Sequence, residues 1–554
     1  MGFVIHELSK KQTSHEIMEV LHSVPPGLPA IYSRMLLRTE ASRQSIISEI
    51  LRWVTMAVRP LTVHELTGAI AIPSIAPLSS DRTIRDHITM CGPILRIRLE
   101  NHPEDSAVDE VHLVHQSARD YLLRKERDED LILEGFRIEE EEAHSKLTRV
   151  CLDCIEKSDL RYEPLDINDA SVLEKSPLLN YASLHWAEHA RKSSAYADKE
   201  LSLSRPFFQK KSCVRKNWFE SYQKAEPPWP LYNVPLLHTA CYFGIDSLAR
   251  KLLAQNARRF TFQKLVDKRD DRGRTPLLLA ARRGLKATVR LLLDYDPDVN
   301  IKDKESGFTA LILSALGGHC EIVQLLLEKG ADINLEAENG PTPLIAAVSL
   351  GLEAVVRLLL KHGADVNMKV GKPGKRALAY AISTQNETIV QLLVNNNADV
   401  NAELLPGGFT ALNLAILTRQ KAIVRLLLEH GADVNANDNR NLFWAAQEGD
   451  EATLQLLLEH GVDVNAKDGI SGNTMLIYAA RQGREAIMRL LMNNNADINA
   501  KNVDGQTALT VATGEGYEAA VRLLLEYGAN VHASDLALAT HEAIVRLLNS
   551  HGAS

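Results

Sequence analysis

The stretch Val424-Arg-Leu-Leu-Leu-Glu-His-Gly-Ala-Asp-Val-Asn435 decides the fold of the C-terminal half of the chain. Its leucine-rich face predicts a buried helix, Gly431 can adopt the positive φ at which helices often end, and Asp433 begins a polar turn. Related stretches recur at residues 289–300, 322–334, 355–367, 389–401, 454–465, 487–499 and 521–532. Such a repeated unit predicts a solenoid of stacked helices, in which function belongs to a surface rather than to a cleft.

Each repeated unit begins at a residue expected to cap its first helix. These residues are Thr275, Thr309, Thr342, Arg376, Thr410, Arg440, Thr474 and Thr507, and they follow one another at intervals of 33 or 34 residues, with one interval of 30. Threonine at an N-cap accepts hydrogen bonds from early amides, and Pro276 and Pro343 suit the first helical position. The period and the Thr-Pro-Leu strings at 275–277 and 342–344 resemble the ankyrin repeat, which implies an α-solenoid over residues 233–554 with about eight fuller repeats and terminal caps.

One position of the ankyrin signature is changed in most units. Only His238 keeps the histidine that forms hydrogen bonds between repeats, whereas Ile312, Ile345, Phe443 and Ile477 replace it elsewhere. We therefore expect few hydrogen bonds between repeats and a stack held by packing. The aspartates of the Ala-Asp-Val-Asn loops are explained by turns rather than by a site.

The N-terminal part predicts a different fold within a mainly α protein. We expect a short helical segment in residues 1–30. In residues 31–135 the pattern predicts a first helix over 31–57, a second that begins after a capping box of Thr62 and Glu65, a third over 83–90 and a fourth over 118–123. Strands are expected at 94–99 and 111–115. The first three helices and the β-hairpin outline a winged-helix-like module. Residues 136–232 predict a helical linker region, which begins at the acidic run Glu139 to Glu142.

The strings Gly27-Leu-Pro-Ala-Ile-Tyr-Ser-Arg-Met-Leu36 and Val111-His-Leu-Val-His-Gln-Ser-Ala-Arg-Asp-Tyr-Leu122 carry a second resemblance. They resemble the segment after the NACHT nucleotide-binding domain in fungal NACHT-ankyrin proteins, which are laid out like NOD-like receptors. The resemblance implies that residues 31–135 form a module with a packing and regulatory role. A NACHT domain needs a Gly-x4-Gly-Lys-Ser/Thr loop, and none occurs in this sequence. We therefore expect a shortened relative that binds no nucleotide and uses no cofactor.

Composition narrows the classes of partner. The net charge is -8, and the helix expected at 82–90 carries Asp86 beside Arg82 and Arg85, so direct nucleic-acid binding is not expected. No apolar run reaches membrane-spanning length. Six irregularly placed cysteines favour a reducing compartment, which predicts a protein of the cytoplasm, with the nucleus as the alternative.

Two motifs permit a metal interpretation. Cys151 and Cys154 form a single Cys-x2-Cys pair without a second pair, so buried thiols are the preferred interpretation. His185, Glu188 and His189 spell His-x-x-Glu-His, which would place two imidazoles one helical turn apart, as in a zinc enzyme. No third ligand is identified, and the segment resembles the helix that leads into the repeats in NACHT-ankyrin proteins. We predict a noncatalytic protein and keep the zinc enzyme as an alternative.

The expected binding surface is the concave strip formed by the first helices and by the loops that precede them, here called fingers. Arginine and aromatic residues anchor protein interfaces. The candidates are Arg272, Arg274, Arg282, Arg283, Phe308, Lys375, Phe409, Arg481 and Gln482, with Leu316, Leu417 and Asn473 on the same strip. The arginines at 269–283 would suit an acidic segment of another protein. An alternative is a transcription coregulator of a fungal biosynthetic gene cluster.

Overall fold

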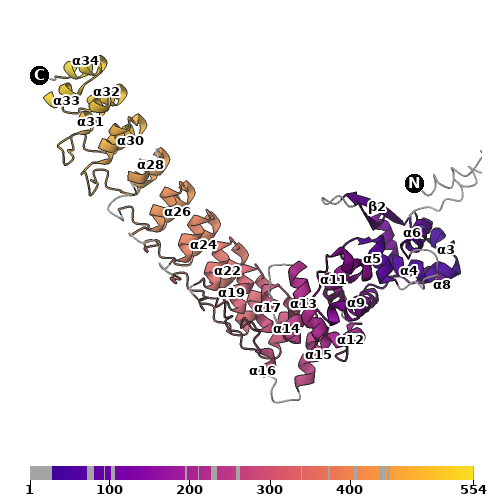
Figure 1. The fold of residues 1–554 in the computed structure, drawn as a ribbon. Helices are drawn as coiled ribbons and strands as arrows, with labels where there is room; N and C mark the ends of the chain where they lie inside the picture. The colour runs from indigo at the N-terminus through magenta and orange to yellow at the C-terminus, as the bar shows by residue number, and fades with distance from the viewer. Residues whose placement is uncertain are drawn as a thin grey trace, which may run out of the picture. The chain divides into compact units, whose positions relative to one another are not determined.

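The computed structural model describes residues 28–70, 80–92, 94–101, 107–193, 196–209, 211–225, 234–257, 263–338, 340–371, 375–404, 408–435, 441, 443–445 and 450–552. The helical segment expected within residues 1–30 lies almost wholly outside these ranges. The chain divides into two compact units (Figure 1). The first comprises residues Met1–Ala280 and Leu285–Pro297, and the second comprises Ala281–Gly284 and Asp298–Ser554. The described part is mainly helical, as predicted.

The first compact unit opens with a winged-helix arrangement. Its elements are α3 (Leu28–Leu37), α4 (Ala41–Met56), β1 (Leu61–Thr62), α5 (Val63–Ala69), α6 (Ser80–Met90), β2 (Leu95–Asn101), β3 (Ala107–Leu113), α7 (Gln116–Leu122) and α8 (Leu131–Glu134). The three strands form an antiparallel sheet in the order β1-β3-β2. Strand β1 was not predicted, because its two residues carry no alternation of their own and pair only once Val111 is beside Leu61.

Local capping chemistry explains where two of these helices begin. Thr62 Oγ1 accepts a hydrogen bond from the Glu65 amide at 3.0 Å, and Glu65 Oε2 accepts one from the Thr62 amide at 2.9 Å, so the predicted capping box is confirmed. The single helix expected over residues 31–57 is wrong, because the structure has two. The chain leaves the helical conformation at Glu40, whose ψ of 137° is extended, and α4 then begins at Ala41.

The helical linker region packs around aromatic residues. Its elements are α9 (Glu140–Lys157), η1 (Asp159–Arg161), α10 (Ala170–Lys175), α11 (Leu179–Lys192), α12 (Ala197–Glu200), η2 (Pro206–Phe208) and α13 (Cys213–Ala225). Trp186 of α11 is fully buried, and its ring centroid lies 5.2 Å from Phe207 and 5.7 Å from Trp218. This cluster joins α11, η2 and α13 into one core.

The first repeat helices belong to the same unit. They are α14 (Leu236–Phe243), α15 (Asp246–Ala257), α16 (Gln263–Val266), α17 (Pro276–Arg282) and α18 (Lys286–Leu293), and the boundary between the two units falls within α17. His238 Nε2 lies 3.0 Å from the Arg274 carbonyl oxygen. The hydrogen bond between repeats that the signature histidine implies is therefore present here.

The second compact unit is a row of helix pairs (Figure 1). The first helices are α19 (Ala310–Leu316), α21 (Pro343–Ser349), α23 (Ala377–Ser383), α25 (Ala411–Leu417), α29 (Met475–Arg481) and α31 (Ala508–Glu515). The second helices are α20 (Cys320–Glu328), α22 (Glu353–Lys361), α24 (Glu387–Asn395), α26 (Lys421–Glu429), α28 (Glu451–Glu459), α30 (Glu485–Asn493) and α32 (Glu518–Glu526), and α33 (Ala533–Leu538) and α34 (Glu542–Ser550) follow.

The predicted helix starts and stops are found in these repeats. Thr309, Thr342, Thr410, Thr474 and Thr507 each accept a hydrogen bond from the amide three residues later. Arg376 occupies the cap position without a side-chain cap, and Arg440 lies outside the described residues. Helix α26 ends at Glu429, and Gly431 follows with a φ of 80°. Glycine therefore stands where the turn requires left-handed backbone.

Asparagines connect the repeats by hydrogen bonds, so the expectation that packing alone holds the stack is wrong. In the described residues, seven asparagine Oδ1 atoms each accept a hydrogen bond from a backbone amide in the next repeat, at 2.7 to 3.2 Å. The acceptors are Asn300, Asn334, Asn367, Asn401, Asn435, Asn465 and Asn499, and the donors are Asp332, Asp365, Asp399, Asp433, Asp463, Asp497 and Asn530. We call this series the asparagine ladder.

The aspartates of the same loops form turns, as expected. Asp433 Oδ1 accepts a hydrogen bond from the Asn435 amide at 2.9 Å, and the equivalent bond is present in the neighbouring loops at Asp399 and Asp463. Each loop is thus closed by its aspartate and joined to the next loop by its asparagine.

Candidate protein-binding surface

The candidate arginines belong to two different compact units. Arg272 and Arg274 lie in the first unit, and Arg282 and Arg283 lie in the second. The expectation that Arg274 is exposed is wrong. Its side chain is 7% exposed and its Nη2 atom lies 2.7 Å from Asp270 Oδ2. This ion pair joins the two ends of the finger. Arg272 is half-buried, and its amide donates to Asp270 Oδ1 at 3.0 Å.

Arg282 and Arg283 are exposed at the end of α17. The Arg282 carbonyl oxygen lies 3.4 Å from His319 Nε2, and the imidazole of His319 lies close against Gly284. The backbone that presents both arginines is therefore fixed by the following repeat. These two side chains remain candidates for binding a partner.

Phe308 and Asn473, two further candidates of the expected strip, are less exposed than predicted. Phe308 is half-buried and packs with Leu316 against a small core of Ile312, Ala337 and Ala346, so both contribute to the join between repeats. Asn473 is only 1% exposed, and its Oδ1 accepts a hydrogen bond from Asn502 of the next finger at 3.0 Å. The expected exposure of Asn473 is wrong, because adjacent fingers cover it.

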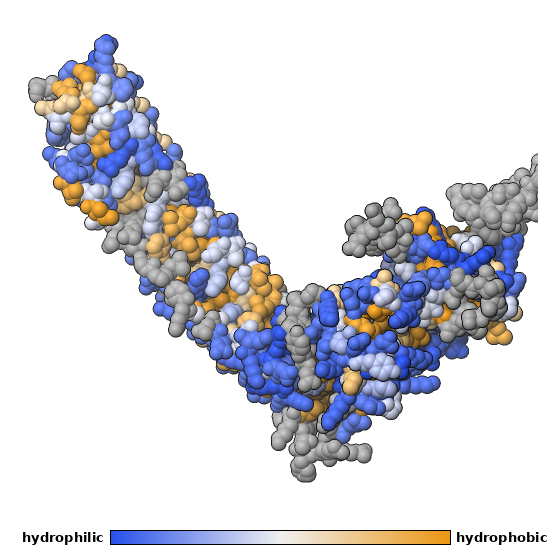
Figure 2. Space-filling view, viewed as in Figure 1, coloured by the Kyte–Doolittle hydropathy of each residue, from blue (hydrophilic) through white to orange (hydrophobic). Residues whose placement is uncertain are grey.

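Aromatic side chains recur in the fingers and first helices of the repeats that begin at Arg376, Thr410, Arg440 and Thr474. Phe409 stacks on Trp444 with a centroid distance of 5.2 Å and an interplanar angle of 25°. Lys375 Nζ lies 5.6 Å from the ring centroid of Tyr380. Tyr380, Phe409, Trp444 and Tyr478 are all half-buried, and we call these four residues the aromatic strip. Figure 2 shows apolar residues among polar ones along the surface of this unit.

Sequence reasoning found Phe409 but missed the other three members of the aromatic strip. Tyr380, Trp444 and Tyr478 each lie four residues after the cap position of their repeat. The repeat between them has Leu414 at this position, which is also half-buried. Comparing this one position across the aligned units would have identified the strip.

Two cations flank the aromatic strip. Lys375 lies in the finger before α23, and Arg481 ends α29 beside Gln482; all three side chains are exposed. Carboxylates in these fingers already accept hydrogen bonds from their own loops. Glu403 Oε1 accepts one from the Gly408 amide at 2.9 Å. Burial opposes the ionisation of Asp468, but hydrogen bonds from Ser471 and its neighbours outweigh that effect and lower the pKa of Asp468 to about 2.

Of the two histidines of the zinc alternative, His189 lies in a buried hydrogen-bond network of the first unit, and His185 is half-buried. His189 is fully buried, and its Nδ1 lies 2.8 Å from His144 Nδ1, while its Nε2 lies 2.9 Å from the Tyr181 hydroxyl. That hydroxyl accepts a hydrogen bond from the Val58 amide at 2.9 Å. Both ring nitrogens of His189 are therefore occupied. Burial lowers the pKa of His144 and of His185 to about 4.

The remaining groups of the metal interpretations are also engaged elsewhere. Glu188 Oε1 lies 3.0 Å from Lys192 Nζ. Burial raises the pKa of the Cys151 and Cys154 thiols, that of Cys154 to about 12, which opposes the thiolate form that binds zinc. Within the described ranges, no three His, Cys, Asp or Glu side chains are grouped so that they could hold a metal ion.

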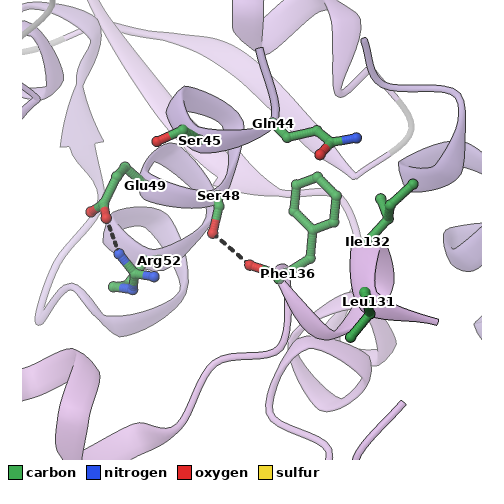
Figure 3. Close-up of a pocket in the computed structure, with 9 residues that line it drawn as sticks. Gln44, Ser45, Ser48, Glu49, Arg52, Leu131, Ile132 and Phe136 are labelled. Carbon is green, nitrogen blue, oxygen red and sulfur yellow. Dashed lines mark hydrogen bonds and ion pairs between the residues drawn. The ribbon is translucent and has the colours of Figure 1, made fainter. Parts of the chain in front are cut away.

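A cavity of about 280 Å³ lies between α4 and α8 (Figure 3). Ser48 Oγ donates to the Gly135 carbonyl oxygen at 3.0 Å on one side, and Glu49 pairs with Arg52 beside it. Leu131 on the rim is 87% exposed. Polar groups on the wall of the cavity thus bond to one another, and no reaction is assigned to the cavity.

In the part of the chain that the structure covers, no helix has the length and apolar character needed to cross a membrane.

Comparison with known proteins identifies the two kinds of domain. Residues 237–337, 298–370, 332–404, 369–438 and 442–535 match the sequence profile of ankyrin repeats (3 copies), and these matches together cover more than half of the chain. Residues 32–134 match the winged helix domain of GPI inositol-deacylase.

Two curated fungal proteins are similar to parts of the chain. "Azaphilone pigments biosynthesis cluster protein L" of Monascus ruber is 27% identical over 299 residues, which are 50% of this chain and 61% of that protein. "Vegetative incompatibility protein HET-E-1" of Podospora anserina is 30% identical over 115 residues, which are 20% of this chain and 8% of that protein. The chain thus spans less than two thirds of the length of either relative. Because the repeat matches extend over more than half of its length and the helix pairs stack as that profile implies, this chain belongs to the ankyrin-repeat family.

Proposed function

We propose that this protein is a noncatalytic scaffold or regulator that binds another protein through the first-helix and finger side of its repeats. The observation that carries the proposal is the aromatic strip of Tyr380, Phe409, Trp444 and Tyr478, which stays partly exposed beside Lys375 and Arg481. Tyrosine, tryptophan and arginine are the residue types that contribute most binding energy at protein interfaces. An ankyrin-repeat architecture supports the same class of function.

The winged-helix part is proposed to serve as a packing and regulatory module. Arg85 of α6 pairs with Asp109 of β3, and the same helix carries Asp81 and Asp86, so α6 does not present the clustered positive charge that suits a DNA groove. The likeness of residues 32–134 to a known winged helix domain supports this role.

Quantitative affinity capture of the full chain from expressing cells tests the proposal. We expect at least one protein to be recovered with the unaltered chain and lost with Arg282→Glu combined with Arg283→Glu, or with Trp444→Ala. The control is Arg489→Glu, since Arg489 is equally exposed but lies on the second helix α30. Recovery of the same proteins by all variants would contradict the proposed surface.

A second candidate function follows from one of the similar proteins. The name of the Monascus ruber relative places that protein in a pigment biosynthesis cluster. We propose as the alternative that this chain acts in the nucleus as a transcription coregulator of a fungal biosynthetic gene cluster. Imaging of the tagged full chain, with transcript profiling after gene deletion, tests it. A chain restricted to the cytoplasm, with unchanged cluster transcripts, would exclude this alternative.

A further inference from the structure

We infer that the aromatic strip binds a short, extended, acidic segment of a partner protein, and that one aromatic or large aliphatic side chain of this segment packs against the Phe409 and Trp444 pair. The inference deepens the proposed function and rests on it. It concerns the repeats capped by Arg376, Thr410, Arg440 and Thr474, which all belong to the second compact unit.

The apolar contact point is the stacked pair. Phe409 comes from a finger, and Trp444 comes from the next repeat, yet their ring centroids are 5.2 Å apart. Each ring therefore restricts the rotation of the other, so little side-chain entropy remains to be lost when a ligand binds. Both side chains stay half-buried, and Leu417 at the end of α25 is 40% exposed. A large apolar side chain would gain contact area here.

We expect an acidic ligand because the cations beside the strip and the carboxylates in the same fingers differ in their bonding. Among the described residues, neither Lys375 nor Arg481 has a carboxylate partner, and both are exposed. By contrast, Glu403 is bonded to the Gly408 amide and Asp468 to the amides of Ile470 and Ser471. Carboxylates of a ligand would meet two cations that no carboxylate within the described ranges pairs with, which favours complementary charge pairing.

The spacing of the strip fits an extended chain. Packed helices lie roughly 8 to 10 Å apart, and an extended peptide advances about 3.3 Å per residue, so about three ligand residues correspond to each repeat. The path from Lys375 to Arg481 crosses four repeats. A segment of roughly ten residues would therefore reach both cations while its centre lies at Trp444.

Single-stranded nucleic acid is the other polymer that uses aromatic rings and cations. Such binding needs cations that follow the phosphate backbone throughout the site. Here the two cations flank the aromatic residues, and the net charge of the chain is -8. An acidic peptide, whose charges can be spaced around one apolar residue, fits this arrangement better.

Selection from a random dodecapeptide display library with the full chain as bait tests the inference. We expect enriched peptides with Asp or Glu on both sides of a Trp, Phe or Leu. In fluorescence anisotropy, the affinity of such a peptide should fall by about tenfold or more for Trp444→Ala, and equally for Lys375→Glu combined with Arg481→Glu. The affinity should change less than about twofold for Arg489→Glu, which alters the same charge on α30 of the same repeat. The charge variants concern exposed side chains, so they report on binding even if Trp444→Ala lowers stability.

Other outcomes would overturn the inference. These are enrichment of peptides without acidic residues, equal loss of affinity with Arg489→Glu, or displacement of the selected peptide by a 15-nucleotide oligo(dT). Capture of a partner protein from cells that depends on the repeat surface, together with failure to select any acidic peptide, would overturn the inference and leave the proposed function intact. Failure of both experiments would overturn both.

Discussion

The two compact units stabilise their helices in different ways. The first unit relies on groups that occur once, namely the rings around Trp186 and the hydrogen-bonded series from His144 through His189 and Tyr181 to Val58. The second unit repeats one small set of contacts, the asparagine ladder and the leucines of the second helices. Loss of a unique contact should affect a whole unit, whereas loss of one repeated contact should remain local.

The largest effect is expected for Trp186→Ala in the first unit. Because the ring is fully buried among other aromatic rings, its removal should leave a cavity and lower the free energy of unfolding of this unit by about 3 to 5 kcal/mol. Urea unfolding of the full chain, followed by hydrogen exchange and mass spectrometry, measures this loss. Faster exchange throughout α9, α11 and α13 is expected. Exchange confined to α11 would contradict a single cooperative core.

A slightly smaller and local effect is expected for Leu427→Ala in α26. This side chain is fully buried, so the substitution should cost about 2 to 5 kcal/mol. Hydrogen exchange should quicken in α24, α26 and α28 while the first unit keeps its wild-type rates. Unchanged exchange in these three helices would show that the assigned register of the repeats is wrong.

Acid should weaken the first unit through His144. Burial lowers the pKa of His144 from 6.5 to about 4, so between these pH values the folded state binds fewer protons than the unfolded state. The stabilisation is complete above pH 6.5, and for this one group it is lost at up to about 1.4 kcal/mol per pH unit as the pH falls toward 4.

The measurement for this prediction is urea unfolding of the first unit at several pH values. His144→Gln, which cannot take up a proton, should reduce the pH dependence. Equal acid sensitivity in the wild type and His144→Gln would contradict the assignment to His144.

The smallest effect is expected for Asn401→Ala. Asn401 Oδ1 accepts the Asp433 amide at 2.7 Å and its Nδ2 donates to the Gly431 carbonyl at 3.0 Å, but both bonds are exposed. We expect a cost of about 1 kcal/mol and faster exchange at the Asp433 amide. Gln455→Ala, which removes a bond within the single helix α28, is the control and should leave exchange between repeats unchanged. Global unfolding of the stack by Asn401→Ala would contradict the view that each bond of the asparagine ladder stabilises only its neighbouring repeats.

Local patterns in the sequence predicted the parts of the fold that depend on neighbours in the chain. The capping box at Thr62 and the helix end before Gly431 need only a few adjacent residues, and both predictions are confirmed. Apart from the bond at His238, the hydrogen bonds between repeats were not predicted. The sequence placed Asn473 and Arg274 among the finger residues of the binding strip. In the structure the next finger covers Asn473, and the Arg274 side chain pairs with Asp270 in its own finger.

The candidate surface was predictable only in part, for a related reason. Phe409 was recognised because it stands next to the cap residue Thr410, but Trp444 belongs to a unit that lacks a Thr-Pro start. Its importance depends on the ring of Phe409, which another repeat supplies. A pair formed across two repeats is visible only after the units have been placed side by side.

The asparagine ladder also bears on how this protein can change over generations. Six of its rungs join residues 31 or 32 positions apart, while the rung from Asp463 to Asn435 spans only 28 and persists at 3.2 Å. The missing residues fall between two anchored turns. A repeat can therefore lose about four residues and keep its hydrogen bond to the next loop, so the length of this region can change over generations while the stack persists.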